Sequence, residues 1–325
     1  MDTPDFFFNR AGRVRAFWRL AVFTAAYMVV QMALFLGLRF GMAVLLPKGS
    51  GRLLIETGWG FVVQSLIIFG AAAAVGLACS AALEELPWRA LGWARHRGWL
   101  RDTLKGLLVG ALSVGLAAAL GAALGSYKFS FAAAAGAEAV GRTLLVSCVI
   151  FVLGSASEEM LFRGYPFQTL LRSWPLWAAI IPTSVPFALV HLTNPNVAPG
   201  FTFVNTVLAG VLLGVAYWRT RSLWFPFGLH WGWNYAQGAF IGSPVSGITS
   251  ITPDPVLNFS DTGPAWLGGG GYGIEGGALC TLALALTTLY VWRTRLLSAT
   301  PEMSKYTDGE NPQEAPPEGI HLSLK

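Results

Sequence analysis

Two adjacent carboxylates lie inside an apolar stretch of this chain. Glu158 and Glu159 follow the uncharged run 143–156, and Arg163 comes one helical turn later. Ionisable side chains are costly at the depth of a lipid bilayer and mark functional sites there. On a helix Glu159 and Arg163 are four residues apart and can form an ion pair, whereas Glu158 points about 100° away toward a different neighbour.

Two further apolar stretches each hold a histidine. His191 follows Phe187 by four residues, so a helix would place the aromatic ring beside the imidazole. His230 and Asn234 have the same spacing and would point into one cavity. Counted from the predicted helix ends, Glu158 and the two histidines lie roughly 14–21 Å along their helices. The three stretches can therefore meet inside a membrane.

Each feature alone also has a structural explanation. A histidine within a membrane often does no more than hydrogen-bond a neighbouring helix. An ion pair such as Glu159 with Arg163 is more often structural than catalytic. The combination is harder to explain in that way, because so many polar groups on three helices are costly unless they serve a function.

The composition indicates the class of protein that positions these side chains. Of 325 residues, 54% are hydrophobic and 12% are charged, with a mean hydropathy of +0.54, whereas soluble domains have about 25% charged residues. We therefore expect an all-α, polytopic integral membrane protein. About eight transmembrane helices are predicted, at residues 17–46, 58–82, 104–124, 139–171, 176–192, 202–218, 222–242 and 274–292. The fourth is long for one span, which indicates either a tilted helix or a break near Gly164-Tyr165-Pro166.

The basic residues predict the orientation of these spans. With a cytoplasmic amino terminus, the inner segments hold 16 Lys and Arg and the outer segments hold 5, with Arg163 set aside. The positive-inside rule then places both termini in the cytoplasm, so the net charge of +5 reflects topology and not nucleic-acid binding. We expect four regions: spans one to three in 1–137, a catalytic core of spans four to seven in 138–243, an outer loop and last span in 244–297, and a disordered cytoplasmic tail in 298–325.

Two small-residue patterns predict close helix packing. Gly106-x-x-x-Gly110 and Gly210-x-x-x-Gly214 would let neighbouring helices approach. Both patterns arise easily in a glycine-rich membrane chain, so we interpret them as packing features.

The three motifs together resemble a known family. They are Glu158-Glu159-x-x-x-Arg163, Phe187-x-x-x-His191 and His230-x-x-x-Asn234. In type and order they are similar to the motifs of the CAAX-protease and bacteriocin-processing (CPBP) intramembrane endopeptidases. The resemblance covers about residues 140–240, and eight spans with cytoplasmic termini also resemble the prenyl-protein endopeptidase branch.

The resemblance implies hydrolysis of a peptide bond within the membrane. Glu158, helped by His191, would deprotonate a water molecule, and His230 and Asn234 would donate hydrogen bonds to the oxyanion of the tetrahedral intermediate. The remaining motif residues would support the site structurally: Glu159, Arg163 and Phe187.

A metal-dependent mechanism is also open at this stage. One carboxylate and two imidazoles, from Glu158, His191 and His230, form a potential zinc ligand set with an open water position. The family is commonly classed among metalloproteases, although a metal-free glutamate mechanism is also argued for it. Asn234 suits an oxyanion donor better than a zinc ligand, which favours the mechanism without a metal cofactor.

The implied partners are the lipid bilayer and a membrane-embedded peptide or lipidated protein, including a prenylated CAAX-type substrate, with no nucleic acid. The sequence indicates neither the substrate nor the oligomeric state. Two other function classes were weighed. A proton-coupled transporter would commonly show repeats or matched broken helices in two halves, which this sequence lacks. A non-catalytic membrane scaffold of the same fold would tolerate loss of a motif residue, and none is missing.

Overall fold

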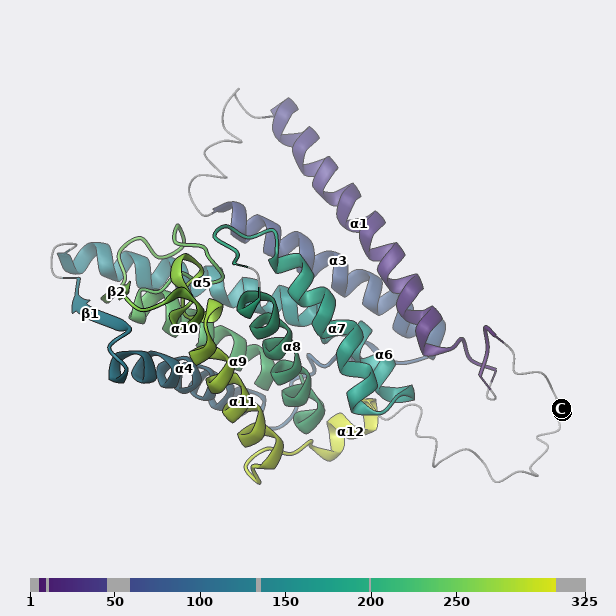
Figure 1. Cartoon of the computed structure of the whole chain (residues 1–325). Helices are drawn as coiled ribbons and strands as arrows, with labels where there is room; N and C mark the ends of the chain where they lie inside the picture. Colours follow the sequence, from purple (N-terminus) through teal and green to yellow (C-terminus); the bar gives the residue numbers. More distant parts are fainter. Residues whose placement is uncertain (1–5, 10–11, 46–58, 133–135, 199, 308–325) are drawn as a thin grey trace, which may run out of the picture.

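The computed structural model describes residues 6–9, 12–45, 59–132, 136–198 and 200–307 and is mostly helical. The longer helices are α1 (Ala16–Leu45), α3 (Trp59–Glu84), α4 (Trp99–Ala123), α5 (Gly136–Phe162), α6 (Tyr165–Ser173), α7 (Leu176–His191), α8 (Phe201–Thr220), α9 (Trp224–Tyr235) and α11 (Ala278–Arg293). The shorter elements are η1 (Trp88–Leu91), β1 (Tyr127–Phe131), the π-helix η3 (Ala236–Ile241), β2 (Leu257–Asp261), α10 (Ala265–Gly268), η4 (Gly270–Tyr272), η5 (Ile274–Gly276) and α12 (Pro301–Thr307). Figure 1 shows their arrangement.

Several of these helices are suited to a membrane. Among the described residues, five helical segments have the length and apolar composition to cross a bilayer: α1, α3, α4, the unit formed by α5 and α6, and α8. The apolar helices α7 and α11 are shorter, and α9 has 12 residues before it continues as η3. The structure therefore agrees with the all-α membrane architecture that the sequence predicts. The number of spans, the side of the termini and the assignment of the core spans stay predictions.

The break that the sequence indicated as one alternative for the fourth apolar stretch is present. Helix α5 ends at Phe162, and α6 begins at Tyr165 after Gly164. The amide groups of Arg163 and Gly164 both donate to the carbonyl of Glu159, each at 2.9 Å. Pro166 lies in the first turn of α6, where its missing N–H costs nothing. The glutamate pair thus occupies the last turns of α5, just before the break.

Helix α9 lies backbone to backbone against α4. The contact uses two glycines on each helix: Gly106 and Gly110 on α4, Gly228 and Gly232 on α9. A Cβ atom on any of the four would collide with a backbone carbonyl of the other helix, so the predicted packing role of the α4 pair is confirmed. His230 and Asn234 each lie two residues beyond an α9 glycine, about 200° around the helix. The glycine face is therefore turned to α4, and the opposite face carries the polar side chains.

A buried ion cluster fastens α1 and α3 to α6. Glu84 on α3 accepts hydrogen bonds from Arg172 Nε at 2.9 Å and Nη2 at 2.8 Å, and it pairs with Arg19 on α1. The buried residues of α1 all lie between Ala16 and Tyr27. Beyond that half, α1 leans away from α3 (Figure 1). The ion cluster thus joins one end of α1 and one end of α3 to α6, and α3 also packs against α5.

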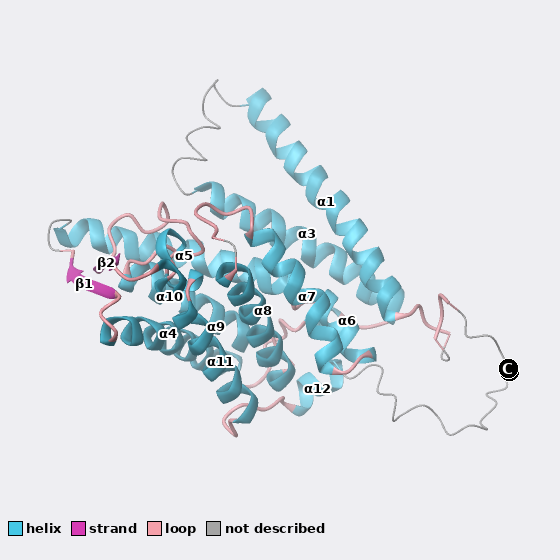
Figure 2. Ribbon diagram, viewed as in Figure 1, coloured by secondary structure: helices cyan, strands magenta, loops and turns pink. Residues whose placement is uncertain are grey.

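Two regions differ from the sequence-based expectation. The segment predicted as an outer loop contains β2, which pairs antiparallel with β1 in register from Tyr127 opposite Asp261, and both strands lie at one edge of the helical bundle in Figure 2. The sequence predicts disorder from residue 298, whereas Pro301–Thr307 form helix α12. Burial of Met303 and a 3.0 Å hydrogen bond from Arg89 to the Tyr306 hydroxyl hold this helix. The end of the predicted tail lies outside the described residues.

Candidate active site

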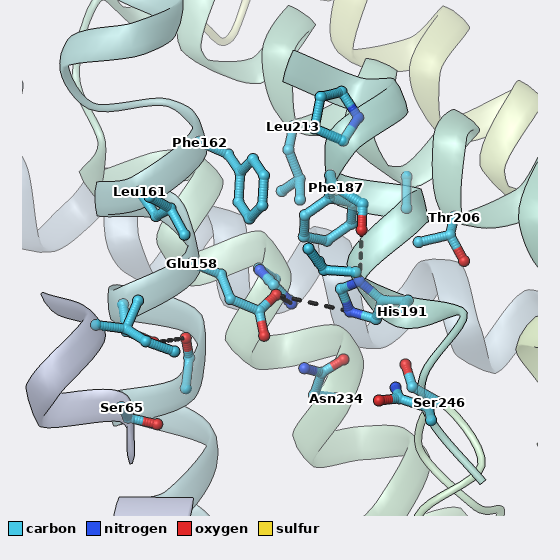
Figure 3. Close-up of a pocket in the computed structure, with 18 of the residues that line it drawn as sticks. Ser65, Glu158, Leu161, Phe162, Phe187, His191, Thr206, Leu213, Asn234 and Ser246 are labelled. Carbon is cyan, nitrogen blue, oxygen red and sulfur yellow. Dashed lines mark hydrogen bonds and ion pairs between the residues drawn. The ribbon is translucent and has the colours of Figure 1, made fainter. Parts of the chain in front are cut away.

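The three predicted motifs come together at one cavity. Glu158 on α5, His191 at the end of α7, and His230 and Asn234 on α9 all line a cavity of about 810 Å³. Figure 3 shows Glu158, His191 and Asn234 directed toward a common space. The meeting of these helices, which the sequence predicted from depth alone, is thus seen in the structure.

Glu158 faces both histidines. Its Oε2 atom lies 3.9 Å from His191 Nε2 and 3.7 Å from His230 Nε2. The Glu158 side chain is 31% exposed, yet Oε2 is itself buried and has no hydrogen-bond partner within the described part of the chain. Polar atoms separated by slightly more than a hydrogen bond are commonly bridged by water. The geometry therefore suits a small polar molecule held by one carboxylate oxygen and two imidazole nitrogens.

The Nδ1 atom of each imidazole has a hydrogen-bond acceptor beside it. His191 Nδ1 lies 2.7 Å from the carbonyl oxygen of Phe187, and His230 Nδ1 lies 3.0 Å from Glu159 Oε1. A carbonyl and a carboxylate can only accept, so both Nδ1 atoms carry the hydrogen. In the neutral rings, Nε2 therefore presents a lone pair toward Glu158.

Glu159 and Arg163 form the predicted pair, 3.3 Å apart and almost fully buried. Arg163 also donates to the carbonyl of Gly210 on α8, at 3.3 Å. The sequence did not suggest the bond between Glu159 and His230. Glu159 therefore supports the site more directly than expected, because it orients an imidazole as well as pairing with the arginine.

Phe187 packs against the charged and aromatic groups of the site. Its ring centroid is 4.5 Å from the ring of His191, as the four-residue spacing predicted, and 5.2 Å from that of Phe162. The guanidinium carbon of Arg163 lies over the same ring at 4.5 Å. A cation over an aromatic face is stabilised by the ring quadrupole, so Phe187 links the helix of His191 to the ion pair on α5.

A zinc site does not fit this arrangement well. Tetrahedral zinc ligands at about 2.0–2.2 Å from the metal lie roughly 3.3–3.6 Å from one another. The oxygen of Glu158 is farther than that from both His191 Nε2 and His230 Nε2. No group of three or more His, Cys, Asp and Glu side chains in the described ranges has the placement to hold a metal ion. The predicted metalloprotease class therefore finds no support among the described residues.

The structure adds one carboxylate that the sequence did not single out. Glu275 in η5 lines the same cavity and is bonded by Trp233 Nε1 at 3.1 Å and by Ser246. It lies in a glycine-rich stretch without a motif, so no sequence pattern indicated it. By contrast, Gly228-x-x-x-Gly232 could have been found by the same small-residue pattern that identified the glycines of α4.

Comparison with protein families agrees with this geometry. Residues 139–236 match the family model described as Type II CAAX prenyl endopeptidase Rce1-like. This segment belongs to the CPBP family of CAAX proteases. The match runs from α5 to the start of η3 and contains all three motifs. Searches of curated proteins and of solved structures found no match for this chain.

The match to the CAAX protease family model also bears on the location of the protein. Members of this family are integral to the membrane, and the structure holds several apolar helices of spanning length, so this chain is a multi-pass integral membrane protein. The family implies a hydrolase acting on peptide bonds, with a substrate associated with the bilayer.

Proposed function

We propose that this CAAX protease family member is an intramembrane endopeptidase in which Glu158 and His191 activate a water molecule. One observation carries the proposal. Glu158 Oε2 faces the Nε2 atoms of His191 and His230 at 3.9 and 3.7 Å, while both Nδ1 atoms are engaged by fixed acceptors. Three groups that can bind one water are thereby oriented by the protein before substrate arrives.

The attacking step uses Glu158 as the general base. A water molecule gives one hydrogen to Glu158 Oε2 and the other to the lone pair of His191 Nε2, which leaves an oxygen lone pair for the scissile carbonyl carbon. As the new C–O bond forms, Glu158 takes the proton and the carbonyl electrons move to oxygen. Because the Nδ1 hydrogen of His191 is held by the Phe187 carbonyl, the ring cannot turn away from the water.

The second half of the reaction needs donors for the oxyanion and a proton for the leaving group. Asn234 Nδ2 donates to the oxyanion from the cavity wall. His230 donates from Nε2 when it carries a second proton, since its Nδ1 hydrogen goes to Glu159. Glu158 then returns its proton to the amide nitrogen, the C–N bond breaks, and a carboxylic acid and an amine are released, which leaves Glu158 as a carboxylate again.

We propose a lipidated peptide as the substrate. Beside the polar groups, apolar side chains of α1, α3 and α5 line the cavity, among them Phe23, Met28, Ile68 and Leu161. A hydrocarbon chain attached to the peptide would bury apolar surface there, at about 25 cal/mol per Å². The prenyl endopeptidase description of the matching family agrees with this choice.

The test is cleavage by purified protein in lipid vesicles. Farnesylated and geranylgeranylated CAAX-type peptides and their unmodified counterparts would be incubated with wild type, Glu158→Gln and Glu138→Gln, and the products identified by mass spectrometry. Glu138 is a matched control, because it is an exposed glutamate in the first turn of the same helix. Wild type and Glu138→Gln should cleave, whereas Glu158→Gln should be inactive while folding normally. Retained cleavage by Glu158→Gln would remove it from the mechanism, and equal cleavage of unmodified peptides would remove the lipid from recognition.

A further inference from the structure

The segment 242–277 contributes a half-buried carboxylate to the cavity, Glu275, that the mechanism above does not use. Glu275 precedes α11 and lies outside the residues that match the CAAX protease family model. A carboxylate that is partly withdrawn from water is costly unless its hydrogen-bond partners are well placed, so the partners of Glu275 need an explanation.

The carboxylate of Glu275 connects the catalytic helix to a distant turn. Oε1 accepts from Trp233 Nε1 at 3.1 Å, and Oε2 accepts from the backbone N–H of Ser246 at 2.5 Å and from its hydroxyl at 3.0 Å. Trp233 lies on α9 between His230 and Asn234. One side chain thus holds both α9, at the level of the proposed oxyanion donors, and residue 246.

Ser246 belongs to a tight turn that forms part of the cavity wall. Val245 and Ile248 pair as an isolated bridge, and Ser246 has a φ of 48°, a left-handed conformation that is unfavourable for a non-glycine residue. The two hydrogen bonds to Glu275 help to hold it there. Val245 also packs with Ile150 and Phe151 of α5, about two turns before Glu158.

The turn and Glu275 are both anchored from other helices. Asn205 on α8 donates to the carbonyls of Glu275 and Gly277, each at 2.8 Å, which fixes the backbone of η5. Asn196, shortly after His191, donates to the carbonyl of Gly247 at 3.2 Å. The turn is therefore linked to the chain that follows α7 as well as to α9.

We propose that Glu275 is a positioning residue of the catalytic cavity. Its carboxylate fixes the turn Val245–Ile248 as a wall of the cavity and holds α9 at Trp233, so that His230 and Asn234 stay aligned with Glu158. Glu275 binds no reacting atom in this scheme. The inference rests on the proposed peptidase function, and the experiment below separates the two.

The same segment offers a matched control. Asp261 at the end of β2 accepts from the backbone N–H groups of Gly263 at 3.1 Å and Gly270 at 2.8 Å. It is a carboxylate with backbone partners in the same part of the chain, but it does not line the cavity. Asp261→Asn therefore reports what loosening this segment does without disturbing the cavity wall.

The test compares Glu275→Gln with Asp261→Asn in lipid vesicles. We would measure kcat and KM on the lipidated peptides, the thermal midpoint, and hydrogen exchange of the amides at 245–248. Loss of a supporting partner behind a catalytic group typically costs 10–100-fold. Glu275→Gln should lower kcat by about that factor with KM within about threefold, and exchange at 245–248 should become faster. Asp261→Asn should change kcat by less than about threefold and leave exchange at the turn unchanged.

Several results would overturn the inference. The first is that Glu275→Gln and Asp261→Asn show the same kcat and the same exchange rate at 245–248. The second is that Glu275→Gln lowers kcat while the amides at 245–248 stay protected from exchange. If Glu275→Gln does not fold, Ser246→Ala serves instead, because it removes only the hydroxyl hydrogen bond to Glu275. It should lower kcat and speed exchange at 245–248 by smaller factors, and no change in either would count against the positioning role of Glu275. If wild type cleaves none of the peptides, the proposed function fails, and exchange at the turn alone decides whether Glu275 holds it.

Discussion

The ion pair of Glu159 and Arg163 gives the most quantitative prediction from this structure. The two side chains are 3.3 Å apart, with 0% and 1% of their side-chain surface exposed. At an effective dielectric constant of 20, two unit charges at that distance attract each other by about 5 kcal/mol. Removing one partner of a buried pair costs about 3–5 kcal/mol, because the other charge stays buried and unpaired.

Three variants separate the charge pair from its hydrogen bonds. Glu159→Gln keeps an acceptor for His230 but leaves Arg163 unpaired, and Arg163→Met leaves Glu159 unpaired. Each should destabilise the protein by about 3–5 kcal/mol. The double variant replaces the pair with neutral groups and should recover at least about 2 kcal/mol relative to either single variant, because replacing a whole buried pair is often nearly neutral.

The assay is thermal unfolding in one detergent, with kcat measured in parallel. Using the scaling of soluble domains, at about 2–4 °C per kcal/mol, each single variant should melt roughly 10 °C below wild type. The exposed Glu138→Gln change should stay within about 0.5 kcal/mol of wild type. A double variant whose loss equals the sum of the two single losses would refute the reasoning, because additivity would mean that the two charges do not interact.

Two further predictions concern the reaction itself. Asn234→Ala should lower kcat by about 10²–10³-fold without a comparable loss of thermal stability, as expected for one oxyanion donor; a change confined to KM would assign Asn234 to substrate binding instead. Prolonged chelation, followed by elemental analysis and a peptide assay, should leave kcat/KM within about twofold, because Glu158 lies farther from the two histidines than zinc ligands lie from one another. Activity that chelator removes and Zn²⁺ restores would show that these three side chains hold a metal.

The sequence predicted much of the site because many of its contacts join residues one helical turn apart. The four-residue spacings of Glu159 with Arg163 and of Phe187 with His191 depend only on the helical repeat, and both contacts are present. The apolar stretches identified the long helices, since a bilayer requires runs of about 20 apolar residues. The break at Gly164 followed from proline chemistry in the same way.

Contacts between distant segments could not be obtained in this way. Nothing in the spacing of Glu159 shows that it bonds His230, 71 residues later. The isolated carboxylate of Glu275 becomes interpretable only when η5 is placed beside Trp233 and Ser246. The short helix α12 also escaped prediction, because its stability comes from burial of Met303 against other elements and not from its own polar sequence.

The sequence by itself therefore determined which groups enter the membrane and which of them share a helical face. That information is carried by residue type and by the 3.6-residue repeat. Only the tertiary structure decided which nitrogen of His230 faces Glu158, since Glu159 on another helix fixes that ring. It also decided that the glycine face of α9 is turned to α4 and its polar face to the cavity. Hydrogen-bond direction and close packing depend on where other segments lie, and no single stretch of sequence encodes that.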